Sequence, residues 1–282
     1  MNFQPKLKEV EMKNMVKNIC AAMVISLCAA GHLSATENNP NNDNKFMEEN
    51  LNLTQEWDKT FPQSDKVDHK KITFHNRYGI TLAADLYVPK NVTGKLPAIA
   101  ISGPFGAVKE QASGLYAQTL AERGFLTIAF DPSYTGESSG QPRYVASPDI
   151  NTEDFSAAVD YLSTRDDVDA ERIGILGICG WGGMALNAAA IDTRIKATVT
   201  VTMYDMSRVN ANGYFDSMNA DARHELRRQL NAQRTEDYRN GTFALGGGVV
   251  DPLPADAPQF VKDYHASVSY THLRAHETRH DL

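Results

Sequence analysis

The stretch that decides the fold is IGILGICGWGGM, residues 173–184. Residues 173–176 form an apolar run of the kind that makes a strand covered on both faces of a sheet. Four glycines follow within seven positions, and residues 184–191 have the composition of a helix. The sequence therefore predicts a tight turn from a buried strand into a helix, with Cys179 at the turn.

Strands and helices alternate on both sides of this turn. Residues 72–88 alternate apolar and polar positions around a turn at 76–79, which predicts an antiparallel edge hairpin. Residues 96–101 form an unbroken apolar run, which predicts a buried strand, and residues 125–130 and 195–201 are also expected to form buried strands. Two segments have the apolar spacing of helices: 115–120 and 155–162.

This alternation predicts an α/β fold in which helices cover both faces of a mostly parallel sheet. We place the core at residues 67–204, and we expect the sheet to be incomplete at the C-terminus. Polar helices are expected after Met203, so we interpret residues 205–266 as a cap over the carboxyl edge of the sheet.

The N-terminal residues 1–35 have the pattern of a signal peptide. Lys13 and Lys17 precede the apolar stretch 19–30, and small residues follow up to Ala35. The apolar stretch, about a dozen residues, is shorter than the roughly 20 that cross a bilayer. We therefore expect cleavage near Ala35, a periplasmic or secreted protein, and no stable membrane insertion afterwards.

Composition limits what the rest of the chain can be. The 282 residues are 42% hydrophobic and 22% charged, which is typical of one globular domain. With 28 basic against 35 acidic residues and no basic run, nucleic acid is not an expected partner. Residues 36–66 begin with a charged, Asn-rich stretch and are interpreted as a flexible linker.

The last stretch, residues 267–282, has neither helical nor strand periodicity and contains His272, His276 and His280. It resembles translated sequencing-adapter DNA, so we interpret it as a non-native tail and leave it out of the fold.

Cys179 is the one cysteine that remains when Cys20 and Cys28 leave with the signal peptide. A free cysteine is usually a small buried hydrophobe. At this turn, backbone N–H groups at the start of the helix would instead favour a thiolate and bind an oxyanion. We therefore interpret Cys179 as a nucleophile. Small neighbours that let helix and strand cross closely are Gly177, Gly180, Gly182 and Gly183.

The segment 175–184 resembles the Gly-x-Cys-x-Gly-Gly elbow of dienelactone hydrolases and related α/β-hydrolases, including polyketide-transferase-like and X-prolyl-peptidase-like branches. The resemblance spans residues 67–203, and residues 102–111 and 131–140 also agree with it. Trp181 departs from the pattern, because the commonest elbow has Gly there.

This resemblance implies a hydrolase that cleaves an ester, lactone or thioester of a small-molecule substrate without a metal or an organic cofactor. Cys179 would attack, and the backbone N–H groups of Gly180 and Phe105 would bind the oxyanion. Trp181 and Tyr204 are expected to line the substrate pocket.

In this fold the catalytic acid and histidine follow the nucleophile along the chain. We expect both beyond residue 266, so this chain is expected to lack them, and none of its histidines is assigned as the base. Asp205 is interpreted as a solvated carboxylate. Lys109 and Glu110 are interpreted as a surface ion pair rather than as residues that orient their loop.

Three alternatives remain open at this point. Acyl transfer and peptide hydrolysis use the same elbow, and a non-catalytic binding protein would keep the fold with an inert thiol at Cys179.

Overall fold

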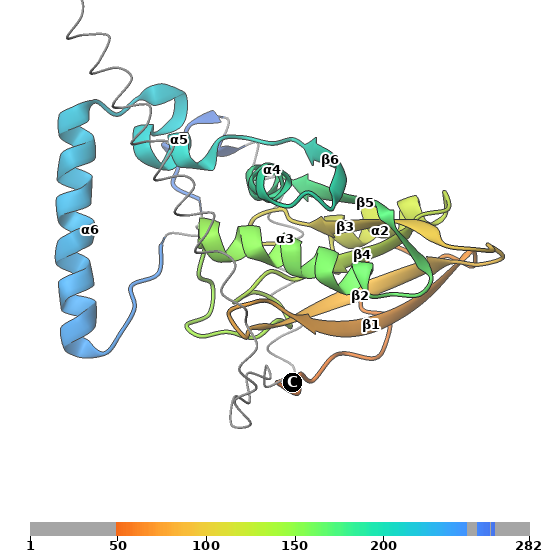
Figure 1. Cartoon of the computed structure of the whole chain (residues 1–282). Coiled ribbons are helices and arrows are strands. Elements are labelled where there is room, and N and C mark those ends of the chain that lie inside the picture. Colours follow the sequence, from red (N-terminus) through yellow and green to blue (C-terminus); the bar gives the residue numbers. More distant parts are fainter. Residues whose placement is uncertain (1–48, 247–252, 260, 263–282) are drawn as a thin grey trace, which may run out of the picture. The chain divides into compact units, whose positions relative to one another are not determined.

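The computed structural model describes residues 49–246, 253–259 and 261–262 (Figure 1). The signal peptide predicted at residues 1–35 and the tail at 267–282 lie outside the described residues, so both stay predictions. Among the helices that are described, none combines the length and the apolar character needed to cross a bilayer.

The described strands form one six-stranded sheet in the order β1-β2-β4-β3-β5-β6 (Figure 1). Their bounds are Val67–His75 for β1, Thr81–Pro89 for β2, Leu96–Ser102 for β3, Leu126–Phe130 for β4, Val168–Ile178 for β5 and Ile195–Val201 for β6. Strand β2 runs antiparallel to both β1 and β4, whereas β4, β3, β5 and β6 are parallel. The predicted hairpin in front of a mostly parallel sheet is confirmed.

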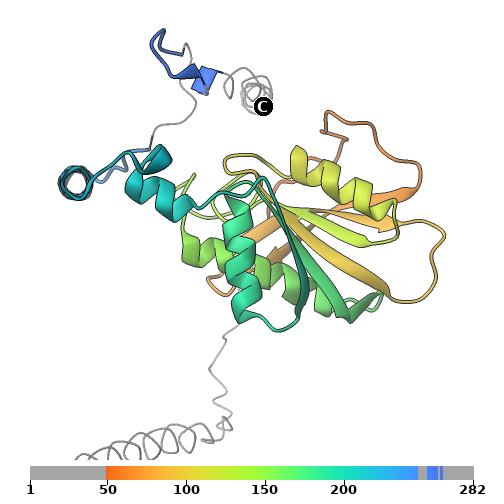
Figure 2. The ribbon, with the colours of Figure 1, turned by 90° about the horizontal axis from the view of Figure 1, so that it is seen from above.

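Helices cover both faces of this sheet. Their bounds are Ala112–Ala121 for α2, Pro148–Ser163 for α3 and Trp181–Ile191 for α4. Figure 2 shows α2 on one side of the sheet and α3 with α4 on the other, and two separate groups of buried apolar residues match these two sides. The predicted α/β architecture is therefore confirmed.

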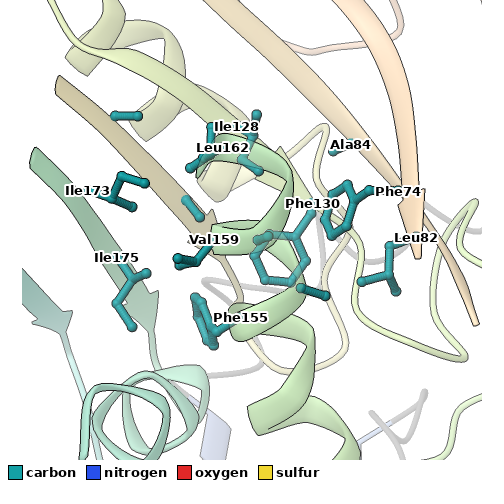
Figure 3. Packing of buried hydrophobic residues seen from close by; sticks show 14 of the residues in the cluster. Phe74, Leu82, Ala84, Ile128, Phe130, Phe155, Val159, Leu162, Ile173 and Ile175 are labelled. Atoms are coloured by element: carbon teal, nitrogen blue, oxygen red, sulfur yellow. The ribbon is translucent and has the colours of Figure 1, made fainter. Parts of the chain in front are cut away.

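Helix α3 supplies the apolar stripe that its sequence predicts. Phe155, Val159 and Leu162 are fully buried and face the sheet, as Figure 3 shows. The rings of Phe155 and Phe130 meet edge to face with 5.2 Å between centroids. The helix starts at Ser147, whose side chain accepts a hydrogen bond from a first-turn N–H.

Strand β6 differs from the prediction. Residues 195–201 were expected to form a buried strand, but no residue of β6 is buried and the side chain of Val199 is 51% exposed. Among the described strands β6 is an edge that pairs only with β5, and α4 is the helix that packs against it. Its sequence, IKATVTV, contains Lys196, Thr198 and Thr200, so it lacks the unbroken apolar run of a strand covered on both faces.

The segment before β1 is in contact with the domain, although residues 36–66 were expected to be a linker. The rings of Trp57 and His69 lie 5.1 Å apart, and Lys59 is only 8% exposed. Lys59 Nζ lies 3.1 Å from Asp85 Oδ2 in β2. Packing therefore begins before Val67, because an aromatic contact and a buried ion pair hold this segment.

Two further helices follow β6, α5 (Met206–Asn212) and α6 (Ala220–Asn240), with a short 3₁₀ turn at Tyr214–Asp216 between them. Asn219 caps the start of α6, and Gly241 ends it in the left-handed conformation with φ 64°. No residue of α6 is buried. The helices predicted beyond Met203 are present, and their role as a cap stays a prediction.

Candidate functional site

Cys179 lies at the sharp turn between β5 and α4. Its φ of 59° places a non-glycine residue in the left-handed region, which costs about 1–3 kcal/mol and persists only where the surroundings hold it. Its N–H donates to Val201 O at 2.8 Å, and its carbonyl accepts from Gly182 N at 3.0 Å. Cys179 is partly exposed as a residue. This is the conformation that a nucleophile elbow requires.

Gly177 is required by the crossing of strand and helix. A Cβ on Gly177 would lie 2.3 Å from the carbonyl oxygen of Trp181, which is backbone and cannot swing aside. A Cβ on Gly183 would meet nothing within 4 Å. The close approach predicted for all four glycines is therefore wrong for Gly183, because its Cα faces open space.

The segment that follows β6 packs against Gly180 and Gly182. A Cβ on Gly180 would lie 2.3 Å from Met206 Sδ, and one on Gly182 would lie 2.7 Å from Met203 Cγ. Residues 203–206 therefore pack directly against the turn, and small residues at 180 and 182 make that contact fit.

The loop after β3 touches the turn as well. Gly103 has φ 97°, and a Cβ there would lie 2.4 Å from Ile178 O and 2.8 Å from the Cβ of Trp181. Phe105 follows two residues later and packs against the core. Among the described residues, none accepts a hydrogen bond from the N–H of Phe105 or of Gly180. The two predicted oxyanion donors thus belong to segments that meet at the elbow.

Trp181 and Tyr204, predicted to line the substrate pocket, lie in different environments. Trp181 is 3% exposed and packs in the core, with its ring 6.2 Å from that of Phe155. Tyr204 is 37% exposed. A surface hollow is lined by Glu49, Leu51 and residues of the loop 136–143, and it contains neither of them. Their pocket role stays a prediction.

The ion pair predicted for Lys109 and Glu110 is present, but its predicted place at the surface is wrong, because Lys109 is only 1% exposed. Its Nζ lies 2.9 Å from Asp131 Oδ2 and 2.6 Å from Glu137 Oε2, and it also pairs with Glu110. Burial lowers the pKa of Lys109, but the three carboxylates around it outweigh burial and raise the pKa well above its usual value. A charged ammonium is therefore held inside the domain.

Lys71 lies among three acidic side chains whose carboxylate oxygens come close together. The carboxylate oxygens of Asp58, Glu110 and Glu137 lie within 4.8 Å of one another, a spacing at which carboxylates can bind a cation. Lys71 Nζ lies 2.6, 3.1 and 2.9 Å from them, respectively. Lys71 thus offsets part of the negative charge of the three carboxylates, and we assign the cluster to an ion-pair network that also includes Lys59 and Lys109.

The described histidines do not complete a catalytic triad. His69 and His75 belong to β1, which is four strand spacings, about 19 Å, from β5. His69 Nε2 instead lies 2.8 Å from Asp85 Oδ1. His224 is exposed on α6. Asp205 is exposed, as predicted, and its carboxylate caps α5 by accepting from Arg208 N at 2.9 Å.

Sequence reasoning missed the buried pairing of Lys109 with Asp131. Each residue lies in one of the two stretches, 102–111 and 131–140, that agree with the elbow resemblance. The sequence therefore singled out both stretches, but it did not show that they meet. The pairing of β3 with β4 brings them together.

Comparisons with known proteins agree with this geometry. The family model described as X-Pro dipeptidyl-peptidase (S15 family) matches residues 78–266. Protein PA2218 of Pseudomonas aeruginosa, which is uncharacterised, is 60% identical over 246 residues, 87% of this chain and 65% of that protein. Its crystal structure matches with a TM-score of 0.75 at 64% identity, covering 78% of this chain and 69% of that one.

Two more distant relatives have a described activity or fold. The thiohydrolase aneE of Aspergillus aculeatus is 30% identical over 138 residues, 49% of this chain and 42% of that protein. The α/β-hydrolase GrgF of Penicillium sp. matches in fold, with a TM-score of 0.59 at 21% identity over 72% of this chain and 67% of that one. The chain spans less than two thirds of the length of PA2218 and of aneE. It has the α/β-hydrolase fold, and it belongs to the X-Pro dipeptidyl-peptidase (S15) family.

Proposed function

We propose that this chain carries the nucleophile and oxyanion hole of a hydrolase that cleaves an ester, lactone or thioester of a small substrate, with Cys179 as the nucleophile. The observation that carries the proposal is the left-handed φ of Cys179 at the strand-to-helix turn. Strained backbone conformations cluster at active sites, and here the strain falls on the residue at which the buried strand β5 turns into α4. The similarity to a thiohydrolase supports the same class of chemistry.

The chemical step follows from the positions of these groups. The sulfur of Cys179 attacks the carbonyl carbon, and the carbonyl oxygen becomes an oxyanion that accepts hydrogen bonds from the N–H groups of Gly180 and Phe105. The C–S bond forms as the thiol proton of Cys179 passes to solvent. When the oxyanion returns to a carbonyl, the bond from the carbonyl carbon to the leaving oxygen or sulfur breaks. The alcohol or thiol takes a proton from solvent, and a thioester remains on Cys179. The N-terminus of α4 favours the negative charge of the oxyanion.

Turnover requires one more group. Water must be deprotonated beside the thioester to release the acid, and a positioned base does this in enzymes of this type. Neither His69, His75 nor His224 is placed for that role. We therefore propose formation of the acyl-enzyme as the activity to be sought in this chain.

The test is acylation of the full chain with p-nitrophenyl acetate at pH 8.5, followed by release of p-nitrophenolate and by peptide mass spectrometry. We expect about one acetyl group per chain, on Cys179. Cys20→Ala combined with Cys28→Ala should keep the full burst, and Cys179→Ala should lose it. Acetylation spread over lysines, with the burst unchanged in Cys179→Ala, would exclude the nucleophile assignment.

Peptide hydrolysis is the second candidate, and the match to the S15 family model favours it. An amide has a poorer leaving group than an ester, so attack by Cys179 on it depends more strongly on a proton donor. Acylation by Ala-Pro-p-nitroanilide at a rate comparable to that of the ester would favour the peptidase reading.

A further inference from the structure

Lys109 is fixed at two of its atoms by one carboxylate. Its backbone N–H donates to Asp131 Oδ1 at 2.8 Å, and its Nζ donates to Asp131 Oδ2 at 2.9 Å. Both side chains are completely buried. A buried ammonium without partners is strongly unfavourable, so this pairing leaves Lys109 little freedom to move.

Asp131 in turn organises the loop that follows β4. Its Oδ2 accepts from Glu137 N at 2.9 Å, and Gly136 packs so closely on it that a Cβ would lie 2.2 Å from Asp131 Cγ. One carboxylate therefore joins the loops that leave β3 and β4. Both loops leave the carboxyl ends of parallel strands, the edge at which β5 leads into Cys179.

The loop that carries Phe105 is thus held at two points. At its start, Gly103 lies against Ile178 O and the side chain of Trp181. Four residues after Phe105, Lys109 is held by Asp131. Between these points the backbone closes a turn, since Ala107 N donates to Pro104 O at 3.1 Å. The position of the Phe105 N–H is therefore set by the elbow on one side and by the ion pair on the other.

We propose that Lys109 is a positioning residue that, through its pair with Asp131, holds the Phe105 N–H where the oxyanion forms. This inference rests on the proposed function, because the oxyanion hole belongs to it. A positioning role for Lys109 predicts a different result from a role in stability alone. Loss of Lys109 should impair reactions that pass through an oxyanion and should leave other reactions of the same sulfur unchanged.

Two reactions of Cys179 distinguish a positioning role of Lys109 from a purely stabilising one. Acylation by p-nitrophenyl acetate builds an oxyanion, whereas alkylation by iodoacetamide displaces iodide at a saturated carbon and builds none. We expect Lys109→Met to slow acylation at least about ten-fold, since the loss of one oxyanion donor costs 10²–10³ in rate and a displaced donor loses part of that. Alkylation, measured on the Cys179 peptide, should stay within about two-fold of the unmodified chain.

Lys59 provides a matched control within the same network. It is also buried, and it pairs with Asp58 and Asp85 rather than with the loop that carries Phe105. Lys59→Met removes a buried ammonium at similar structural cost, and we expect it to leave the ratio of acylation to alkylation unchanged. An equal fall of this ratio in Lys59→Met would show that the effect is general destabilisation, and it would overturn the inference.

Lys109→Met leaves the buried Asp131 carboxylate without its cation, so two further variants keep the test decisive if it folds poorly. Lys109→Met combined with Asp131→Asn removes both charges of the pair, and Lys109→Arg keeps the cation. With folding checked by circular dichroism, we expect the double variant to lose acylation selectively and Lys109→Arg to recover most of it. A folded double variant that is acylated at the original rate would overturn the inference alone. Failure of the unmodified chain to be acylated on Cys179 would overturn the proposed function and the inference with it.

Discussion

The backbone N–H of Cys179 donates a hydrogen bond to the carbonyl oxygen of Val201, with 2.8 Å between nitrogen and oxygen. Val201 is the last residue of β6, so the neighbouring strand holds the backbone of Cys179 in its left-handed conformation. This bond is part of what maintains the left-handed conformation at the turn.

Because this conformation strains any residue with a Cβ, we expect Cys179→Gly to be more stable than Cys179→Ala by about 1 kcal/mol. Both variants lack the sulfur, and they differ in whether the strain remains. Urea unfolding of the two proteins at pH 7 measures the difference. An alanine variant at least as stable as the glycine variant would show that the turn is not strained at residue 179.

Glycines at the turn should differ sharply in their tolerance of a methyl group. We expect Gly177→Ala to lower the free energy of unfolding by about 1–3 kcal/mol, because the new Cβ meets the backbone oxygen of Trp181. Gly183→Ala meets nothing within 4 Å, and it should be neutral or stabilising by up to about 1 kcal/mol, since alanine favours a helix. Thermal unfolding of the two variants checks this order, and equal losses would contradict the packing described for the turn.

Asp154, on α3, should be essential for stability. It is completely buried and accepts hydrogen bonds from Asn76, Asn151 and both the N–H and the hydroxyl of Ser133. We expect Asp154→Ala to cost about 3 kcal/mol or more, because these donors lose their acceptor in a site that excludes water.

Asp160, on the same helix, is the control for this effect. Its carboxylate is 45% exposed and pairs with Arg194, so Asp160→Ala should change stability by less than about 1 kcal/mol. Chemical denaturation of both variants gives the comparison. Similar losses of unfolding free energy in the two variants would mean that the loss arises from the change in the helix itself and not from the buried hydrogen-bond network.

Glu137 should make stability depend on acid pH. Burial raises its pKa, but the charge of Lys109, together with hydrogen bonds from Lys109, Lys71 and Thr54 N, outweighs burial and lowers the pKa to about 2 from 4.5. A carboxyl whose pKa is lower in the folded state stabilises the fold fully above its unfolded value and loses this contribution as pH falls through the folded value.

The measurable consequence concerns Glu137→Gln. We expect the unmodified chain to be more stable than this variant at pH 6, and we expect the difference to shrink as the pH falls from about 4.5 towards 2. Urea unfolding at several pH values measures it. A difference that stays constant over this range would contradict the ion pairs assigned to Glu137.

The sequence by itself determined the alternation of strands and helices, the hairpin at the front of the sheet and the turn at Cys179. These features are local, because apolar runs, helical spacing and closely spaced glycines depend on neighbours along the chain. The stretches 102–111 and 131–140 also agreed with the family that the elbow resembles.

Tertiary structure decided which of these segments contact one another and which of their residues are buried. Strand β6 is more exposed than predicted, because burial depends on which elements cover a face. Lys109 is buried although lysine usually lies at the surface, because β3 and β4 are neighbours and their loops bring Asp131 to it. The pairing of strands is a long-range property that no local pattern encodes, and it alone places the ion pair beside the elbow.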